Sequence, residues 1–253
     1  MADLHFSCTS CGRCCQDLRL SLSVEEAYDW ASRGGLVQLL CHAAPSVDDG
    51  NEMAAYKRAR RFPARSGDVA IVVQVILAAR FEGACPNLGA DLRCRIYAER
   101  PNVCRIYPAE VIPGFELDPA NKLCPSEAWS NHHPSFRTND GRIVEVETNE
   151  AICDARLASR DDVAVRKSLA SLLGVNIAAL ENEGLAVWTV SPSSLVEALD
   201  EIILNVTSKD IHRQNGEWYF MSLRDKTEAL IVSAGARIVQ TSSSTAVEYM
   251  PLY

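Results

Sequence analysis

The sequence of 253 residues has no long hydrophobic run and no excess of basic charge. Its longest nearly apolar stretch is VAIVVQVILAA at 69–79, which is too short to span a bilayer and predicts a buried strand. The net charge of -8 argues against a general nucleic-acid binder, because such a protein needs a positive surface. We therefore expect neither a membrane nor a nucleic acid among the partners.

Other common signals are missing as well. The sequence contains no repeat of 20–50 residues, no low-complexity tract and no G-x-G-x-x-G nucleotide loop. MADLHFSC has no basic stretch followed by an apolar one, so we expect no secretory signal and a cytoplasmic location. Stable disulfides are uncommon in that compartment. The cysteines are therefore expected to be metal ligands or catalytic groups rather than cross-links.

What the sequence does have is ten cysteines, nine of them between residues 8 and 124. Four fall within CTSCGRCC: Cys8, Cys11, Cys14 and Cys15. A Cys-x-x-Cys turn places two thiolates on one side of a tight loop, close enough to share a cation. Repeated steps of this kind also hold iron–sulfur clusters. Gly12 permits the sharp backbone that such a turn requires.

A second group of cysteines lies in CPNLGADLRCRIYAERPNVCRIYP at 85–108. A turn around Gly89 predicts that Cys85 and Cys94 approach each other. The Pro-led turn in ERPNVC would carry Cys104 back toward them, and Cys124 follows in KLCP. The two groups make sense together if the fold brings them to one place.

The number of thiols limits the kind of site. A zinc ion takes four ligands, and eight thiolates on one divalent ion would leave an excess of six negative charges. Two sites, one polynuclear site, or a site with some spectator cysteines therefore stay open. Four arginines in the same segments could offset the charge by hydrogen bonds to sulfur: Arg13, Arg95, Arg100 and Arg105. Cys41 and Cys153 are expected to be buried small hydrophobes.

CTSCGRCC, then CPNL, then CRIYAERPNVCRIYP and a later cysteine resemble the YkgJ-type cysteine-cluster (CxxCxxCC) family, described as a zinc- or iron-chelating domain. The resemblance covers roughly residues 6–125. It implies metal binding through Cys8, Cys11, Cys14, Cys15, Cys85, Cys94, Cys104 and Cys124. It also implies supporting roles for Arg100, Pro101, Arg105, Tyr107 and Pro108.

The main functional hypothesis is thus a metal-binding protein that chelates zinc, iron or an iron–sulfur cluster through two cysteine-rich segments. One alternative is an iron–sulfur-dependent enzyme, because flagellin lysine N-methylase has a similar cysteine signature. A second is a thiol redox protein, since Cys-x-x-Cys motifs lower thiol pKa values. Four histidines are weaker ligand candidates: His5, His42, His132 and His133.

The fold class is expected to be α+β. Residues 1–150 are predicted to form an irregular cysteine-rich domain organised by metal, with short helices and strands. Residues 151–253 are predicted to form a small mixed α/β domain that binds a protein or peptide partner. Helices are expected over 23–34, 161–174 and 191–205 and in LVQLLCHAAP (36–45), and strands over 69–79, GRIVEVET (141–148), EALIVSA (228–234) and TAVEYMPL (245–252).

Overall fold

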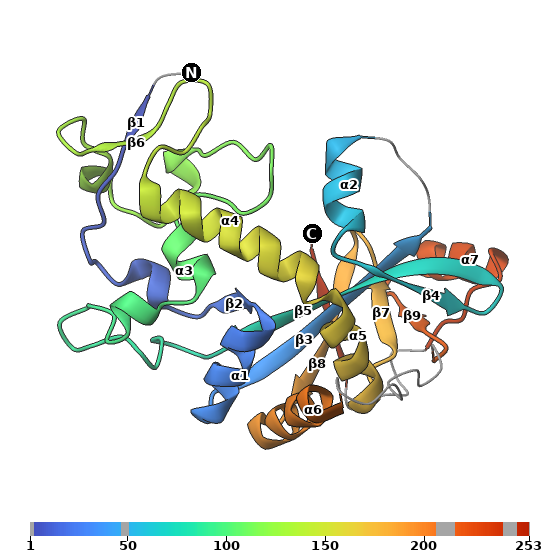
Figure 1. The fold of residues 1–253 in the computed structure, drawn as a ribbon. Helices are drawn as coiled ribbons and strands as arrows, with labels where there is room; N and C mark the ends of the chain where they lie inside the picture. The colour runs from blue at the N-terminus through green and yellow to red at the C-terminus, as the bar shows by residue number, and fades with distance from the viewer. Residues whose placement is uncertain (1–2, 47–50, 206–215, 240–246, 253) are drawn as a thin grey trace. The chain divides into compact units, whose positions relative to one another are not determined.

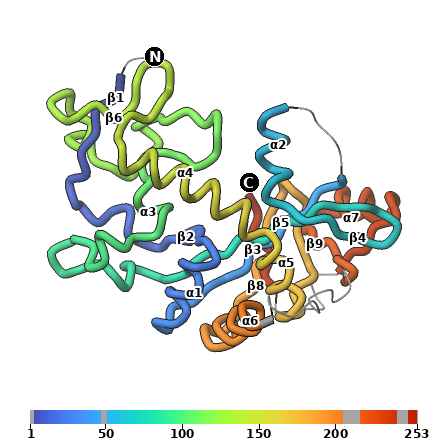
Figure 2. The backbone as a smooth tube through the Cα atoms, in the orientation of Figure 1, coloured from blue at the N-terminus to red at the C-terminus, as the bar shows by residue number. Residues whose placement is uncertain are grey.

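The computed structural model describes residues 3–46, 51–205, 216–239 and 247–252. By spatial contacts the chain forms two compact units, which we call the cysteine unit (Met1–Leu22 and Arg80–Ala158) and the sheet unit (Ser23–Ala79 and Ser159–Tyr253). Figures 1 and 2 let the reader follow how the chain leaves the first unit, enters the second and returns. The sequence predicts consecutive domains over 1–150 and 151–253, whereas each of the two units combines two separate stretches of the chain. Metal binding by residues 1–150 and partner binding by residues 151–253 stay predictions.

The cysteine unit is built almost entirely from short elements, as the sequence predicts for this region. They are β1 (Leu4–His5), η1 (Arg13–Cys15), β2 (Arg19–Leu22), η2 (Tyr97–Glu99), α3 (Asn102–Ile106), η3 (Pro119–Asn121), η4 (Ser126–Trp129) and β6 (Ser135–Arg137), followed by the longer α4 (Val146–Asp161). β1 pairs antiparallel with β6. A small core holds these pieces together, with buried Ile106, Ala109, Leu117, Phe136, Ala151 and Ile152.

The sheet unit contains a mixed β-sheet and its helices. The strands are β3 (Val37–Pro45), β4 (Phe62–Ser66), β5 (Val69–Arg80), β7 (Ile177–Leu180), β8 (Gly184–Val190), β9 (Tyr219–Met221) and β10 (Val247–Pro251). The helices are α1 (Val24–Ser32), α2 (Glu52–Arg58), α5 (Val163–Leu172), α6 (Pro192–Asn205) and α7 (Asp225–Ser233). β3 is central: β5 pairs with one of its edges, and β8 and β7 pair with the other.

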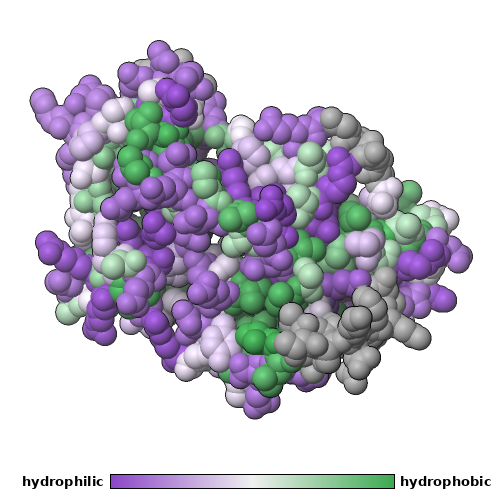
Figure 3. All heavy atoms as spheres, in the orientation of Figure 1, coloured by the Kyte–Doolittle hydropathy of each residue, from purple (hydrophilic) through white to green (hydrophobic). Residues whose placement is uncertain are grey.

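The two faces of this sheet bury different sets of side chains. Ile71, Val73, Val75 and Leu77 alternate along β5 and are at most 2% exposed, so they form one apolar face. Leu40, Ala78 and Val187 form a smaller cluster on the opposite face. α1 contacts β3 and α6, and α6 contacts α5. Hydrophobic residues also reach the surface around α6 (Figure 3), where Ile203 and Leu204 are exposed.

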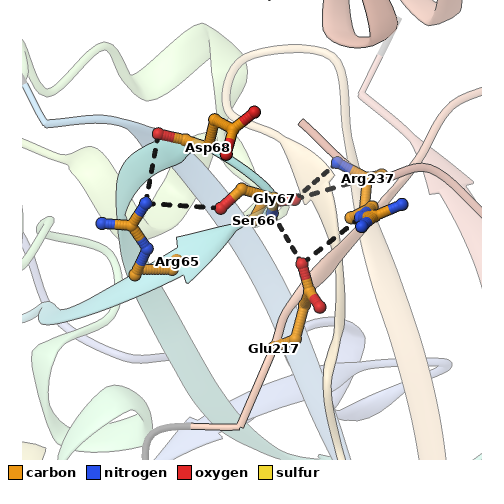
Figure 4. Close-up of polar contacts among 6 residues, drawn as sticks. All are labelled: Arg65, Ser66, Gly67, Asp68, Glu217 and Arg237. Atoms are coloured by element: carbon orange, nitrogen blue, oxygen red, sulfur yellow. Dashed lines mark hydrogen bonds and ion pairs between the residues drawn. The ribbon is translucent and has the colours of Figure 1, made fainter. Parts of the chain in front are cut away.

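The turn between β4 and β5 is fastened to the C-terminal part of the sheet unit (Figure 4). Gly67, with φ of 55°, donates its N–H to Glu217 Oε1 at 2.7 Å. The buried Ser66 accepts from the N–H of Arg237 at 2.9 Å, and Asp68 donates its N–H to the carbonyl of Gly235 at 3.1 Å. These contacts join residues that are about 150 to 170 positions apart in the chain.

Several predictions of secondary structure are confirmed. α1 begins after Ser23, whose side chain accepts from the N–H of Glu26, while Glu26 accepts from the N–H of Ser23. β5, α5, α6 and β10 lie where the sequence predicts them, and the α+β class is confirmed. No helix among the described residues is both long and apolar enough to cross a membrane.

Three predictions are wrong. The stretch around Cys41 is strand β3 rather than a helix, because it is apolar without a helical period and is paired on both edges. Residues 141–148 make one isolated bridge, Arg137 to Ile143, and then enter α4, whose first turn is capped by Glu145. Residues 228–234 belong to helix α7 rather than a strand, and the buried Thr227 and Ile231 have helical spacing.

Candidate metal centre

The first four cysteines lie on a sharply turned segment of the cysteine unit. Gly12 has φ of 71° in the left-handed region, as its predicted role requires, and precedes the 3-10 turn η1. The N–H of Cys15 donates to the carbonyl of Gly12 at 3.0 Å, which closes this turn. The sulfur atoms of Cys14 and Cys15 lie 4.0 Å apart. Near the start of the segment, the N–H of Ser10 points at the sulfur of Cys8 at 3.4 Å.

An aromatic anchor fixes the chain just before Cys8. The ring of Phe6 packs against Trp129 at 4.8 Å and Phe136 at 5.3 Å between ring centroids. The N–H of Ser7 donates to the carbonyl of Ala128 at 3.0 Å. Since η4 begins soon after Cys124, these contacts place Cys8 beside the segment that carries Cys124.

Backbone hydrogen bonds also join Cys15 to the second cysteine segment. The N–H of Cys85 donates to the carbonyl of Cys15 at 2.8 Å, and Gln16 and Ala84 form an antiparallel bridge. A second bridge, between Leu88 and Cys94, folds residues 85–94 into a narrow hairpin. The predicted approach of Cys85 and Cys94 is thus confirmed at the level of the backbone.

Cys104 and Cys124 are each positioned by a neighbouring residue. Cys104 lies on the short helix α3, which the buried Ile106 fixes to the core. The hydroxyl of Tyr107 accepts the N–H of Leu123 at 2.7 Å and also hydrogen-bonds the thiol of Cys124. Tyr107 therefore ties the α3 region to the segment that carries the last predicted ligand.

Burial and the charges of neighbouring thiols change the acidity of the cysteines. Burial first, and then the charges of Cys15, Cys85 and Cys94, together raise the pKa of Cys104 to about 12. Burial also raises the pKa of Cys124, as do the charges of Cys11 and Cys8. These thiols are therefore expected to be protonated near neutral pH unless a cation or a metal stabilises their thiolates.

The thiol groups of Cys14 and Cys15 form a hydrogen bond with each other. The hydrogen bond between the two thiols lowers the pKa of Cys14 and raises that of Cys15. Cys14 is also within the field of Cys8, Cys124 and Cys104. Of this adjacent pair, Cys14 therefore becomes a thiolate more readily than Cys15.

Two cations lie near the thiols. The guanidinium of Arg100 stacks on the ring of Tyr97 at 3.7 Å, and its charge favours the thiolates of Cys15 and Cys104. Lys122 favours the thiolate of Cys124 and forms an ion pair with Glu110. The sequence motif indicates Arg100 but not Lys122, although Lys122 lies only two residues before Cys124.

All eight predicted ligands are described and belong to the cysteine unit, and each of the ten cysteines is a free thiol. Across the described residues, no three His, Cys, Asp or Glu side chains are already arranged to hold a metal ion. The backbone thus gathers the donors, while their side chains do not yet converge.

Cys41 and Cys153 are not among the eight predicted ligands. Cys41 is buried in β3 of the sheet unit, as predicted, and burial raises its pKa. Cys153 is exposed on α4, so the prediction that it is a buried hydrophobe is wrong.

The histidines have other partners or positions. His5 Nδ1 contacts the carbonyl of His133 at 2.8 Å, and His133 Nε2 contacts the carbonyl of Glu127 at 3.0 Å. His42 lies in β3 of the sheet unit, and His132 is exposed. The structure therefore gives no reason to add a histidine to the eight cysteines.

These features define a class: a domain of short elements that gathers many free thiols through its backbone. Residues 7–125 match the model of the CxxCxxCC family, whose description is "Putative zinc- or iron-chelating domain". The matched segment is just under half of the chain. No curated protein and no solved structure matches the chain.

Proposed function

We propose that the cysteine unit chelates zinc or iron through the thiolates of Cys8, Cys11, Cys14, Cys15, Cys85, Cys94, Cys104 and Cys124. The observation that carries this proposal is the gathering of eight free thiols, from stretches up to 116 positions apart in the sequence, within one unit. Thiolates are soft ligands that suit zinc and iron–sulfur clusters. The chemistry of the donor set therefore fits the group that the family description names.

The surroundings of the thiols support the same proposal. Gathering thiolates without a cation is costly, because burial and mutual repulsion both disfavour the charged forms. Burial raises the pKa values of Cys85, Cys104 and Cys124, so their arrangement gains most from a metal that replaces the protons. Arg100 and Lys122 supply part of the compensating charge.

Two alternatives concern what the bound metal does. An iron–sulfur-dependent enzyme, similar to flagellin lysine N-methylase, would use a cluster held by the same thiols. A thiol redox protein would instead use the Cys14–Cys15 contact, where one thiol has a lowered pKa. We favour metal chelation, because a redox pair leaves the other six gathered cysteines without a role.

Two further proposals concern the setting. A reducing compartment such as the cytoplasm would keep the thiols free to bind metal. Residues 151–253 carry a net charge of -4, half of the -8 of the whole chain, and this acidic character suits a basic protein or peptide partner.

The test is purification under anaerobic conditions, followed by metal analysis and a visible spectrum. Zinc or iron at one or more equivalents per chain is expected, with zinc giving a colourless protein and an iron–sulfur cluster a brown one. A matched pair of variants assigns the ligands: Cys94→Ser is expected to lower the metal content, while Cys153→Ser, in the exposed position on α4, leaves it unchanged. A chain without metal that also fails to take up Zn²⁺ or Fe²⁺ would overturn the proposal.

A further inference from the structure

A dense basic segment occurs in a chain that is acidic overall. The sequence YKRARRF at 56–62 carries four cations, whereas the whole chain has a net charge of -8. The segment covers the end of α2 and the turn into β4, so it belongs to the sheet unit and shares no residue with the proposed metal centre. A solvated helix face leaves such side chains exposed, but Arg60 and the side chain of Arg61 are each only 8% exposed.

The backbone after α2 directs the side chains of Lys57 and Arg61 to the same place. Helical hydrogen bonds continue beyond the helix, because the N–H of Arg61 donates to the carbonyl of Arg58 at 3.2 Å. Residues four positions apart therefore lie on one side of this turn. Arg60 fixes the turn, since its guanidinium stacks 3.4 Å from the ring centroid of Tyr56 and donates to the Tyr56 carbonyl at 2.7 Å.

Lys57 and Arg61 share a single carboxylate. Lys57 Nζ lies 2.9 Å from Glu181 Oε1, and Arg61 Nη2 donates to the same oxygen. Figure 1 shows the last turn of α2 beside the end of β7, which Glu181 follows. Within the described part of the chain these two cations have no other carboxylate partner, so one positive charge is in excess. Burial of an uncompensated charge is costly, and a second anion would remove this cost.

Strand pairing places His42 beside Glu181. β3 and β7 are parallel, with His42 opposite Ala179, and the N–H of Glu181 continues the pairing by donating to the carbonyl of Ala43 at 2.9 Å. Since side chains alternate along a strand, Glu181 projects from the same face as Ala179 and therefore as His42. His42 thus belongs to the same group of side chains as the two cations.

Two nitrogen atoms of this group lack an acceptor. Arg61 Nε and His42 Nδ1 are buried and have no hydrogen-bond partner within the described ranges. The guanidinium always carries a proton on Nε, and a neutral imidazole can carry one on Nδ1. Burial, together with the charges of Arg61 and Lys57, lowers the pKa of His42, so its ring is neutral near pH 7. Buried donors of this kind are stabilised by an oxygen atom that accepts from them.

We propose that Lys57, Arg61 and His42 form a binding site for a phosphate group. Its oxygen atoms would accept hydrogen bonds from Arg61 Nε, His42 Nδ1 and Lys57 Nζ. The side chain of Lys57 is 41% exposed, which makes the site reachable from solvent. A phosphate group suits it better than a carboxylate, because it offers more than two oxygen atoms and up to two negative charges to a segment with four cations. Glu181 holds the two cations in position.

The experiment is a calorimetric titration of the full chain with inorganic phosphate in chloride buffer at constant ionic strength. Saturation at one phosphate per chain is expected. Acetate, as the carboxylate probe, should bind at least about tenfold more weakly. Glycerol phosphate distinguishes the source of the group: tighter binding than inorganic phosphate assigns the site to a phosphorylated molecule, and weaker binding assigns it to the free ion.

Three variants locate the site. Lys57→Gln, at a half-exposed side chain that the fold tolerates, should lower the phosphate affinity by at least about tenfold. Glu181→Gln frees both cations from their carboxylate and should raise the affinity, which a merely structural ion pair would not do. Arg58→Gln is the matched control: it removes the same charge from an exposed position of α2 and should keep the affinity within about twofold.

Three results would overturn the assignment: no saturable binding of phosphate, acetate bound as tightly as phosphate, or equal affinities in Lys57→Gln and Arg58→Gln. If Glu181→Gln does not fold, the comparison of the Lys57 and Arg58 variants still decides the matter. None of these results bears on metal binding by the cysteine unit, because the variants change no predicted metal ligand.

Discussion

The sulfur atoms of Cys14 and Cys15 lie 4.0 Å apart, within hydrogen-bonding reach of each other but without a covalent bond. The contact separates their acidities, since the pKa of Cys14 falls and that of Cys15 rises. Cys14 is thus the more acidic of the two adjacent thiols. The following predictions test whether the residues around this pair serve metal binding, and whether the sheet unit is stabilised as its contacts indicate.

Removing the hydroxyl of Tyr107 should weaken metal binding. In Tyr107→Phe the N–H of Leu123 loses its acceptor and Cys124 loses its hydrogen-bond donor, so the Cys124 thiolate is less well held. Loss of such an outer partner typically lowers metal affinity by about 10- to 100-fold. Competition with a coloured chelator measures the metal affinity of each variant. Tyr97→Phe is the matched control, because that ring is exposed and keeps its contact with Arg100; equal affinities in the two variants would refute the role of Tyr107.

Removing the ring of Phe6 should destabilise the cysteine unit and weaken metal binding by Cys8, the first predicted ligand along the chain. Phe6→Ala deletes the ring that packs on Trp129 and Phe136, and we expect the cysteine unit to lose about 2–4 kcal/mol of unfolding free energy. The affinity for metal should fall in parallel, because Cys8 lies two residues away. Chemical unfolding with and without Zn²⁺ measures both. Phe115→Ala, at a ring that is 65% exposed, should change neither quantity.

The turn between β4 and β5 (Figure 4) predicts that substitution by alanine lowers stability more at Gly67 than at Gly34. Gly67 and Gly34 both have positive φ, and alanine in that conformation costs about 1–2 kcal/mol. At Gly67 an added Cβ would also overlap the carbonyl oxygen of Gly235, whereas at Gly34 it would meet nothing within 4 Å. Gly67→Ala should therefore lower the unfolding free energy of the sheet unit by about 1–3 kcal/mol more than Gly34→Ala. Similar losses in thermal unfolding would show that the Gly67–Gly235 approach does not matter.

His42 should make the sheet unit sensitive to acid. Burial first, and then the charges of Arg61 and Lys57, lower the pKa of His42 to about 4, while Glu181 and Gln74 oppose this shift. Because the folded state holds the proton less tightly than the unfolded state, the stability that His42 contributes is present above about pH 6.5 and is lost as the pH falls toward about 4.

The expected loss is a few kcal/mol at most, measured as the urea unfolding free energy between about pH 7 and pH 4. His42→Gln should flatten the curve over this range, whereas His132→Gln, at an exposed position, should follow the unchanged chain. A steep curve that persists in His42→Gln would assign the acid sensitivity to other groups. Glu181, whose pKa is lowered to about 2 by Arg61 and Lys57 despite its burial, responds at lower pH.

Local signals in the sequence predict much of this molecule. The resemblance of CTSCGRCC and the later segment to the CxxCxxCC family implies the eight predicted ligands, and the Ser23 cap predicts α1. The helix predicted around Cys41 is wrong because a short apolar run suits either a helix or a buried strand, and only its partners decide.

Contacts between residues far apart in the chain could not be predicted from the sequence. The parallel pairing of His42 with Ala179 brings together segments 137 residues apart, and no local sequence pattern predicts this pairing. The same holds for Tyr107, whose hydrogen bond to Leu123 positions Cys124. The family resemblance marked Tyr107 as supporting, but its partner could be identified only in three dimensions.

The central claim is that the gathered cysteines chelate zinc or iron, and the most direct measurement is the metal content of the anaerobically purified chain beside that of Cys104→Ser. Cys104 is suited to this test because burial and three neighbouring thiols raise its pKa, so its thiolate needs a compensating cation. The account predicts zinc or iron in the unchanged chain and a clear loss of metal in the variant, with metal retained in Cys153→Ser. An unchanged chain that holds and takes up neither metal, or a Cys104→Ser variant that holds as much as Cys153→Ser, would contradict it.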